Sequence, residues 1–214
     1  KKITISKTDS HLVETYFEDY MKTGGLPEYV LTGDIEYLKE LVDDIIYKDI
    51  AAVHNIKNIQ VLKDYFLLLM ERSGKQASIN KIANILKISP DTSKRYLEYF
   101  SDTYLIYLVN RYGKTNESIL SAKKIYSSDI GIRSLFTGFR DKGSLFENYV
   151  YLKIRNRKPR YIYENTIEMD FFTEDKRLVE VKYHNEKLSE KQQLLFEKIK
   201  ASRKFIILDH VSLE

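Results

Sequence analysis

The chain has no cysteine among its 214 residues, which excludes a disulfide scaffold, a thiolate metal site and a cysteine nucleophile. A lack of cysteine also fits a reducing compartment, and we expect a cytoplasmic location. Only four histidines are present, and none of them forms the i, i+4 pair that favours a zinc site built from histidine.

Long apolar runs are missing as well. No window reaches the roughly 18 uncharged apolar residues of a membrane span, and the first residues do not resemble a signal peptide. We therefore expect no membrane partner. The 43% hydrophobic and 31% charged residues are typical of a globular protein. The chain opens on Lys1 rather than on Met, which favours a fragment of a longer protein.

The net charge of +4 is small, but the middle third of the chain is more basic than either end. Such a distribution favours an anionic partner. A lysine-rich face that is simply solvated is the alternative. Charge alone does not decide between the two.

Three segments follow one another along the chain, and together they predict a mixed α+β protein. Residues 1–57 form a helical lead-in, with a helix over 11–23 that is broken at Gly24–Pro27 and an amphipathic helix that begins after Asp34. The apolar residues of this second helix recur every three or four positions, which predicts a stripe facing a core.

Residues 58–126 have the order of elements of a winged helix. The patterns predict three helices and then two strands joined by a polar loop, at 58–73, 79–86, 90–102, 105–112 and 123–126. Ser78 caps the second helix, and Ser89 followed by Pro90 begins the third.

Residues 127–214 change to an α/β pattern with a small mixed sheet. The predicted elements are a helix at 144–155, strands at 161–164, 167–173 and 178–184, a helix to about residue 201 and a buried strand at 205–208. Ser189 and Gln192 form a capping box at the start of the last helix.

Two carboxylates and a lysine lie on neighbouring strands of this last segment. Glu180 and Lys182 share one face of their strand, because side chains alternate. Asp170 faces the same side of the sheet as Glu180 and Lys182 only under one condition. For residues that lie opposite each other on the two strands, the two residue numbers must sum to an even value. This requires a turn with an odd number of residues, such as 174–176 or 175–177.

Charged residues in an apolar setting must pair or hold a cation. Asp170 and Glu180 supply the hard oxygens that Mg²⁺ (or Mn²⁺) prefers, so we expect them to bind the metal. Lys182 would position the attacking water, and Glu147 on the preceding helix would assist. Such a site performs phosphodiester hydrolysis. The alternative is a structural ion-pair cluster that does not cut.

At these residues the chain resembles the PD-(D/E)XK nuclease superfamily. Asp170 is similar to the first acidic strand residue of that family, Glu180-Val181-Lys182 to its E-X-K motif, and Glu147 to its helical glutamate. Met169 stands where the family has proline. Gln192 with Phe196 lies where some relatives have Q-x-x-x-Y, although the tyrosine hydroxyl is missing.

A wider resemblance covers nearly the whole chain. Its motifs occur in the order Gly24-Gly25-Leu26-Pro27-Glu28, Tyr47-Lys48-Asp49-Ile50, the helix–turn–helix, Lys124-Ile125-Tyr126, Asp129-Ile130-Gly131 and Phe146-Glu147-Asn148-Tyr149-Val150. They resemble the C-terminal half of prokaryotic AAA+-type ATPases, in which a winged helix and a nuclease-like domain follow the ATPase module. This chain has no G-x₄-G-K-[S/T] loop, so the resemblance implies that ATP binds in a module preceding Lys1.

Several basic and polar residues are candidates for contact with DNA. The helix at 90–102 would enter a groove, the second predicted strand would touch phosphates, and the end of the helix at 144–155 would guide the strand toward the acidic residues. The candidates are Thr92, Ser93, Lys94, Arg95, Lys123, Lys124, Arg155, Arg157 and Lys158.

The sequence therefore predicts a DNA-binding, Mg²⁺-dependent phosphodiester-cleaving half of an AAA+-type ATPase. Its expected partners are DNA and its own N-terminal ATPase module. Two alternatives remain: a catalytically inactive half that binds DNA or protein and regulates the ATPase, and a module that mediates homo-oligomerisation.

Overall fold

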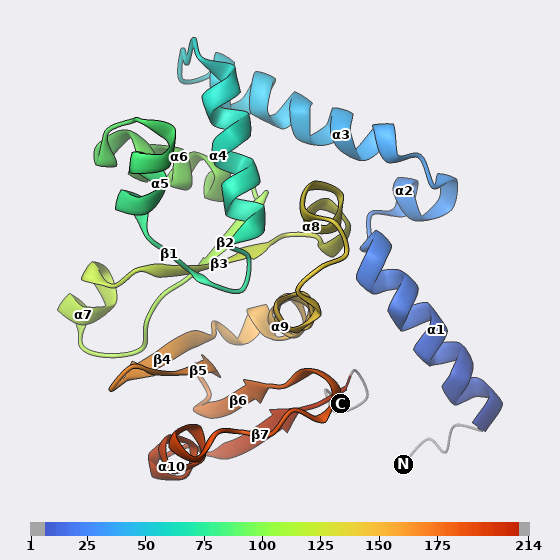
Figure 1. Ribbon diagram of the computed structural model, residues 1–214, viewed down its shortest axis with the longest axis vertical. Coiled ribbons are helices and arrows are strands. Elements are labelled where there is room, and N and C mark those ends of the chain that lie inside the picture. The colour runs from blue at the N-terminus through green and yellow to red at the C-terminus, as the bar shows by residue number, and fades with distance from the viewer. Residues whose placement is uncertain (1–6, 210–214) are drawn as a thin grey trace.

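The computed structural model describes residues 7–209 and has a mixed α+β architecture with two small sheets. Helices α3 to α6 lie above the first sheet, α1 runs along one side of the molecule, and the second sheet lies at the opposite end with α9 between the two sheets (Figure 1). The helices between residues 7 and 209 all lack the length or the apolar composition of a membrane span. The predicted class is thus confirmed at the level of mixed α and β.

The lead-in consists of α1 (Lys7–Thr23), α2 (Pro27–Thr32) and α3 (Ile35–Asp44), and α3 continues with π-helical pairing over Ile45–Ala52. Helix α1 ends where Gly24 takes a left-handed φ of 73°. Asp34 caps α3 by accepting a hydrogen bond of 3.0 Å from the Glu36 amide. Leu38 and Val42 of the apolar stripe of α3 are buried as their spacing predicts, whereas Ile35 in its first turn is exposed.

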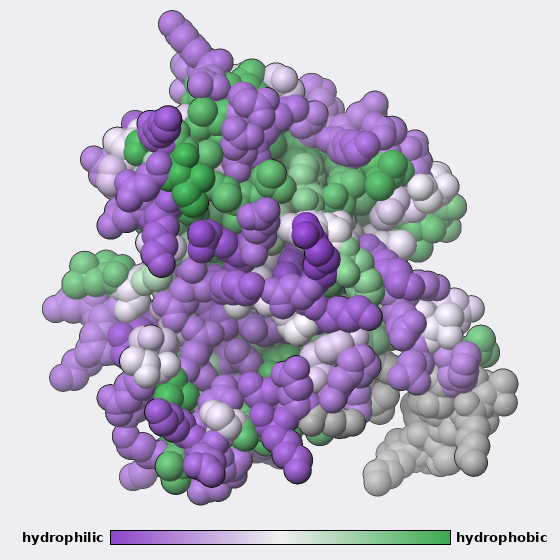
Figure 2. Space-filling model, viewed as in Figure 1, coloured by the Kyte–Doolittle hydropathy of each residue, from purple (hydrophilic) through white to green (hydrophobic). Residues whose placement is uncertain are grey.

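The next elements form a three-stranded sheet of order β1-β3-β2 and the helices around it. They are α4 (Ile59–Glu71), β1 (Gln76–Ala77), α5 (Ile79–Leu86), α6 (Pro90–Asp102), β2 (Ile106–Val109), α7 (Thr115–Leu120) and β3 (Lys123–Ser127). Ser78 and Ser89 cap α5 and α6 through their side chains, as expected. The segment expected to be a polar loop contains the short helix α7, whose Ile119 and Leu120 are exposed and which carries an apolar patch in the surface view (Figure 2).

Helix α8 (Ile130–Thr137) was not predicted from the sequence, and it packs against α1 and α4. The Asp129 carboxylate caps it by accepting from the amides of Gly131 at 2.7 Å and Ile132 at 3.2 Å. The same carboxylate accepts from the Gly25 amide at 2.8 Å. One side chain therefore joins the turn after α1 to the start of α8.

The second sheet has the order β4-β5-β6-β7 and is mixed, because β6 and β7 pair in parallel. Its elements, with the helices that flank them, are α9 (Lys142–Ile154), β4 (Arg160–Glu164), β5 (Ile167–Phe172), β6 (Arg177–Val181), α10 (Glu190–Lys198) and β7 (Arg203–Ile207). The capping box of Ser189 and Gln192 is present at the start of α10. Helix α9 covers one face of this sheet and α10 the other.

Two details of this sheet differ from the expectation. Strand β6 ends at Val181, and residues 183–185 form a 3₁₀ turn in which His184 has a left-handed φ of 51°. Strand β7 was expected to be buried, but it is the edge of the sheet and only Ile207 in it is buried. An edge strand has one neighbour, so its apolar residues are covered on fewer sides.

The contact between α1 and α8 requires glycine at position 131. A Cβ built there would lie 2.0 Å from the Thr23 carbonyl oxygen, whereas a Cβ at Gly143 meets nothing within 4 Å. We predict that Gly131→Ala lowers the free energy of unfolding by about 2–3 kcal/mol, since the backbones must separate. The matched change Gly143→Ala, in the first turn of α9, should leave stability unchanged or raise it by up to ~1 kcal/mol. Urea unfolding of both variants measures this, and equal destabilisation by the two would contradict it.

Candidate functional site

The two predicted metal ligands lie side by side where β5 and β6 diverge. The Asp170 amide donates to Glu180 Oε2 at 3.1 Å, and the Val181 amide donates to Asp170 Oδ2 at 2.9 Å. Glu180 is 1% exposed and Asp170 is 9% exposed. The two carboxylates thus replace backbone partners that the paired strands would otherwise provide beyond Phe171.

The turn between the strands has the parity that the site requires. Phe172 pairs with Leu178, and the Thr173 amide donates to the Arg177 carbonyl, which leaves the three-residue turn 174–176. The residue numbers of the pair Phe172 and Leu178 sum to an even value. Two residues further along each strand, the same register places Asp170 opposite Glu180. This was one of the two turns expected from the sequence.

An irregularity in the pairing of β4 with β5 turns Asp170 toward β3. Tyr161 on β4 lies opposite two residues of β5, Asp170 and Phe171, which is a β-bulge. As a result both residues meet β3: the Phe171 ring packs on Tyr126 at 5.6 Å between centroids, and Asp170 Oδ1 lies 3.4 Å from Lys124 Nζ.

Lys124 is the cation at the centre of the site. Its ammonium lies 2.7 Å from Glu147 Oε1, 2.6 Å from Glu168 Oε1 and 3.4 Å from Asp170 Oδ1, and its side chain has no exposed surface. The sequence-based expectation that Lys124 touches nucleic-acid phosphates from an exposed strand is therefore wrong. The strand does not project from the molecule at this residue; its sheet packs against α9 and β5.

Glu147 reaches the site from α9, as expected. Besides Lys124, it accepts a hydrogen bond of 2.6 Å from the Tyr126 hydroxyl. On the other side, Gln76 donates to Glu168 at 2.7 Å. Sequence reasoning missed Tyr126, Glu168 and Gln76. The alternation of side chains along a strand could have indicated Tyr126 and Glu168, since Tyr126 shares a face of β3 with Lys124 and Glu168 lies two residues before Asp170.

Lys182 completes the predicted set. Its ammonium lies 3.1 Å from Glu180 Oε1, which also accepts a hydrogen bond of 3.2 Å from Gln192 Nε2 on α10. Glu147, Asp170, Glu180 and Lys182 are therefore connected through one network, in which Lys124 joins the first two.

The network holds more negative than positive charge. Four carboxyl groups (Glu147, Glu168, Asp170 and Glu180) are in direct contact with two ammonium groups, Lys124 and Lys182. If every group is ionised, two negative charges remain. Because the network is largely buried, it favours uptake of either protons or a cation.

The pKa values of two carboxyls reflect this excess. Burial first, and then the charge of Asp170, raise the pKa of Glu147 to about 7 and that of Glu180 to about 8, against a usual value near 4.5. Burial lowers the pKa of Lys124, but the surrounding carboxylates outweigh it and hold that pKa well above its usual range. Lys124 is thus charged while Glu147 and Glu180 exchange protons near neutral pH.

The donor set suits a hard divalent cation in chemistry and in charge. Asp170 and Glu180 supply carboxylate oxygens, and Mg²⁺ is commonly held by one or two carboxylates together with water. A third protein ligand is not in place, since the described side chains include no group of three or more His, Asp or Glu arranged to hold a metal. The two charges of such an ion equal the excess of the network.

The candidates on α6 divide into exposed and buried residues. Lys94 and Arg95 are exposed, and Thr92 is half-buried with its hydroxyl 2.8 Å from that of Ser89. Ser93 is fully buried, where its hydroxyl donates to the Ile79 carbonyl at 3.1 Å. The expected contact of Ser93 with DNA is therefore wrong: this residue faces the interior between α5 and α6.

The remaining basic candidates are on the surface but have partners. Lys123 is half-buried and donates to the Ser118 carbonyl at 3.0 Å. Arg155 donates to the Tyr107 hydroxyl at 2.9 Å, Arg157 pairs with Asp175 at 2.9 Å, and Lys158 pairs with Glu174 at 3.1 Å. These three contacts of Arg155, Arg157 and Lys158 are exposed to solvent, where hydrogen bonds and ion pairs are weak and exchange easily.

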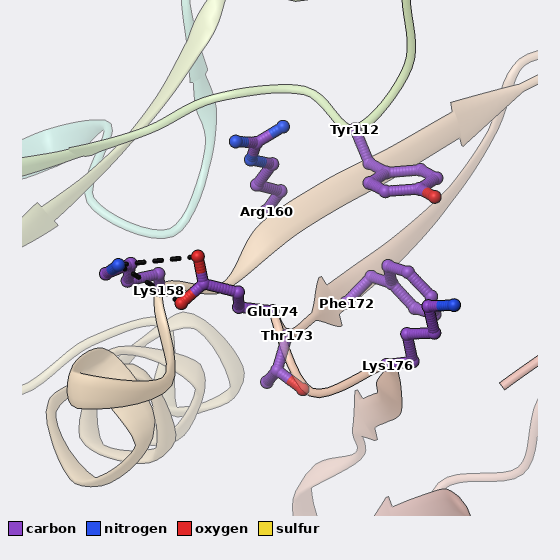
Figure 3. A pocket seen from close by; sticks show the side chains of 7 residues that line it. All are labelled: Tyr112, Lys158, Arg160, Phe172, Thr173, Glu174 and Lys176. Atoms are coloured by element: carbon purple, nitrogen blue, oxygen red, sulfur yellow. Dashed lines mark hydrogen bonds and ion pairs between the residues drawn. The ribbon is translucent and has the colours of Figure 1, made fainter. Parts of the chain in front are cut away.

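Lys158 lines a small cavity beside the turn between β5 and β6 (Figure 3). The cavity measures about 210 Å³, and its walls carry three cations, one anion and two aromatic rings. Its lining residues are Tyr112, Lys158, Arg160, Phe172, Thr173, Glu174 and Lys176. Lys158 and Arg160 thus border a concave surface next to Phe172, the last residue of β5.

Comparison with known proteins gives one family and several relatives. Residues 14–143 match the family described as "Domain of unknown function (DUF8612)". The chain is 36% identical to Uncharacterized protein MJ1544 of Methanocaldococcus jannaschii, over 93% of this chain and 48% of the relative. It is 28% identical to an Uncharacterized protein of Haemophilus influenzae, over 70% of this chain and 40% of the relative.

The chain therefore spans about half or less of the length of these curated relatives. No solved structure matches it. The matched family region ends at residue 143, so it contains Lys124 but not Glu147, Asp170, Glu180 or Lys182.

The raised pKa values predict a pH-dependent stability. The folded chain keeps protons on Glu147 and Glu180 at pH values where the unfolded chain has lost them, so the free energy of unfolding falls as pH rises from about 5 to 8. We predict that Glu180→Gln removes on the order of 2 kcal/mol of this fall, because glutamine cannot ionise.

Urea unfolding at several pH values without divalent ions measures this slope. Glu98→Gln, at an exposed glutamate on α6, is the matched control and should keep the wild-type slope. Equal slopes in Glu180→Gln and the wild type would contradict the assignment.

Proposed function

The chain belongs to the family described as the domain of unknown function DUF8612, and we propose that it is the DNA-binding, divalent-metal-dependent phosphodiester-cleaving half of an AAA+-type ATPase. The observation that carries this proposal is the buried network of Glu147, Asp170, Glu180 and Lys182 with its two excess negative charges. ATP would bind in a preceding module, which is consistent with relatives about twice as long as this chain.

The first sheet and its helices support a winged helix. Helix α4, strand β1, helices α5 and α6 and strands β2 and β3 follow one another in the order of that fold, and β3 pairs between β1 and β2. In a winged helix the third helix enters the major groove. Here that helix is α6, whose N-terminal half exposes Lys94 and Arg95.

The second sheet and α9 support a nuclease-like domain of the PD-(D/E)XK type. Helix α9 carries Glu147, and it precedes the β5–β6 hairpin, which carries Asp170 and Glu180 and is followed directly by Lys182. The order of elements, the odd turn and the hydrogen bond from the Asp170 amide to the Glu180 carboxylate support the proposal. We infer the activity from these side chains rather than from the fold.

Each side chain then has a role in the cleavage. Asp170 and Glu180 would hold a divalent ion, which when bound lowers the pKa of water and neutralises charge on the phosphate. The Lys182 ammonium would orient the attacking water or stabilise the charge that develops on the phosphate. Glu147, with a pKa near 7, would accept a proton at neutral pH, and Lys124 would fix the positions of Glu147 and Asp170.

A path for the DNA strand follows from the exposed cations. Lys94 and Arg95 would contact the backbone at the first sheet, where the half-buried Lys123 of β3 lines the same cavity as Lys94. Arg155, Arg157 and Lys158 would release their exposed partners and contact phosphates beside the second sheet.

A catalytically inactive, regulatory half is the second candidate, and two observations favour it. All four carboxylate oxygens of Asp170 and Glu180 already have donors within the protein. In this view Lys124 is a permanent internal counter-ion, and the domain binds DNA, the ATPase module or a second copy of the chain without cutting. The exposed Asp91 and Glu98 beside Lys94 also weaken the attraction of α6 for DNA.

Metal binding and cleavage distinguish the two candidates. We predict that the wild-type chain binds Mn²⁺ at pH 8, measured by calorimetry, and nicks supercoiled plasmid with Mg²⁺ or Mn²⁺. Lys182→Ala should keep metal binding and lose about 100-fold or more of the nicking rate, because it removes a charge that stabilises the transition state. Lys187→Ala, at an exposed lysine nearby, should cut as the wild type does. Bound metal without any nicking would favour the regulatory half, and absence of metal binding would contradict the metal site.

Contact between α6 and DNA should depend on salt. Each phosphate contact that is lost reduces the slope of log K against log salt by about 0.9, so the double variant Lys94→Ala/Arg95→Ala should lower the slope by about 2. Gel shifts on a short duplex at several salt concentrations measure this. Lys39→Ala, at an exposed lysine of α3, is the control. Affinity that does not change with salt would contradict the predicted phosphate contacts.

A further inference from the structure

A buried arginine on α8 lacks partners for most of its donors. Arg133 is 2% exposed, and its Nε and Nη1 atoms are buried with no hydrogen-bond partner among the described residues. These two nitrogens carry three of the five N–H donors of a guanidinium group. Nearly all buried polar groups in folded proteins have a partner, so donors left in this state indicate a missing ligand or water.

Arg133 lines a cleft of about 260 Å³. The cleft lies between the end of α4, helix α8 and the segment that leads into α9, and its other lining residues are Glu71, Thr137, Arg140 and Asp141. Arg140 is exposed, and its Nε donates to the Thr137 carbonyl at 2.7 Å, which keeps a second guanidinium beside the same cleft.

The neighbouring carboxylates do not satisfy Arg133. Among the side chains that the structure describes, no carboxylate lies within ion-pair distance of it. Asp141 pairs with Lys75 at 2.7 Å and caps α9, and Glu147 contacts Lys124 and Tyr126. Asp141 and Glu147 favour the charged form of Arg133 from a distance, but burial outweighs them and lowers its pKa.

We propose that this cleft binds a phosphate group through Arg133, with Arg140 as the second cation. An unpaired guanidinium is matched by an anion, and a phosphate with its bound waters offers acceptor oxygens on several sides, whereas a carboxylate offers two in one plane. A cleft of about 260 Å³ holds one phosphate group with several waters. The same chemistry is present in inorganic phosphate and in the terminal phosphate of a nucleotide.

Binding is tested by titrating the 214-residue chain with sodium phosphate at constant ionic strength, followed by calorimetry and by the melting temperature. We expect the wild type to melt about 3–5 °C higher at ten times Kd than in chloride alone. Arg133→Met should raise Kd at least tenfold, and Arg140→Met about threefold. Arg203→Met, at an exposed arginine of β7, should keep the wild-type Kd.

The stability of Arg133→Met in chloride alone separates a ligand site from a structural residue. Removal of an unpaired buried charge should leave the melting temperature equal to that of the wild type or higher. A much lower melting temperature together with an unchanged phosphate Kd would overturn the proposal. If this variant does not fold, weaker binding by Arg140→Met supports the site, and a wild-type chain that melts equally in phosphate and chloride overturns it.

Two further ligands define the chemistry. ATP that binds as tightly as phosphate, and loses affinity in Arg133→Met, would identify a terminal phosphate as the source. Phosphate binding without ATP binding would identify the free anion. Acetate that matches phosphate in affinity would overturn the choice of phosphate.

Discussion

The ammonium of Lys124 is the contact on which the rest of the arrangement depends. It is fully buried, and it lies against carboxylates from α9 and β5 while its own strand belongs to the first sheet. One cation therefore joins the two sheets through Glu147, Glu168 and Asp170. Removing one partner of such a network leaves uncompensated charge in the interior, which typically costs about 3–5 kcal/mol. The candidate site and the packing of the two sheets thus depend on the same ion pairs of Lys124.

The core of the site follows from the sequence because it is local. Strand alternation and the parity of one turn are enough to bring Asp170 and Glu180 together, and both depend only on residues between 168 and 182. Lys124 was misplaced because its burial depends on how the first sheet packs against α9, which no local pattern reports. The bulge opposite Tyr161, which turns Asp170 toward β3, also has no signal in the sequence.

The difference between local patterns and long-range packing also explains which parts of the fold the sequence predicts. Helix starts at Ser78, Ser89 and Ser189 were predicted because a serine side chain and the next amides form a self-contained cap. Helix α8 was missed although Asp129 gives it a local cap, because it is only eight residues long and packs against α1 and α4, which lie far away in the chain. Ser93 was placed on the surface from its position near the start of α6, although α5 covers that face.

The central claim is that the network lacks two positive charges and takes up protons or a divalent ion in their place. The most direct measurement is a titration of the glutamate carboxyl carbons by ¹³C NMR. The variants Glu147→Gln and Glu180→Gln identify the signals of these two carboxyls. The account predicts two carboxyls that titrate above pH 6 without metal, and below pH 6 once Mg²⁺ is added. If every glutamate titrates below pH 5 in the metal-free chain, the network is balanced and the account is wrong.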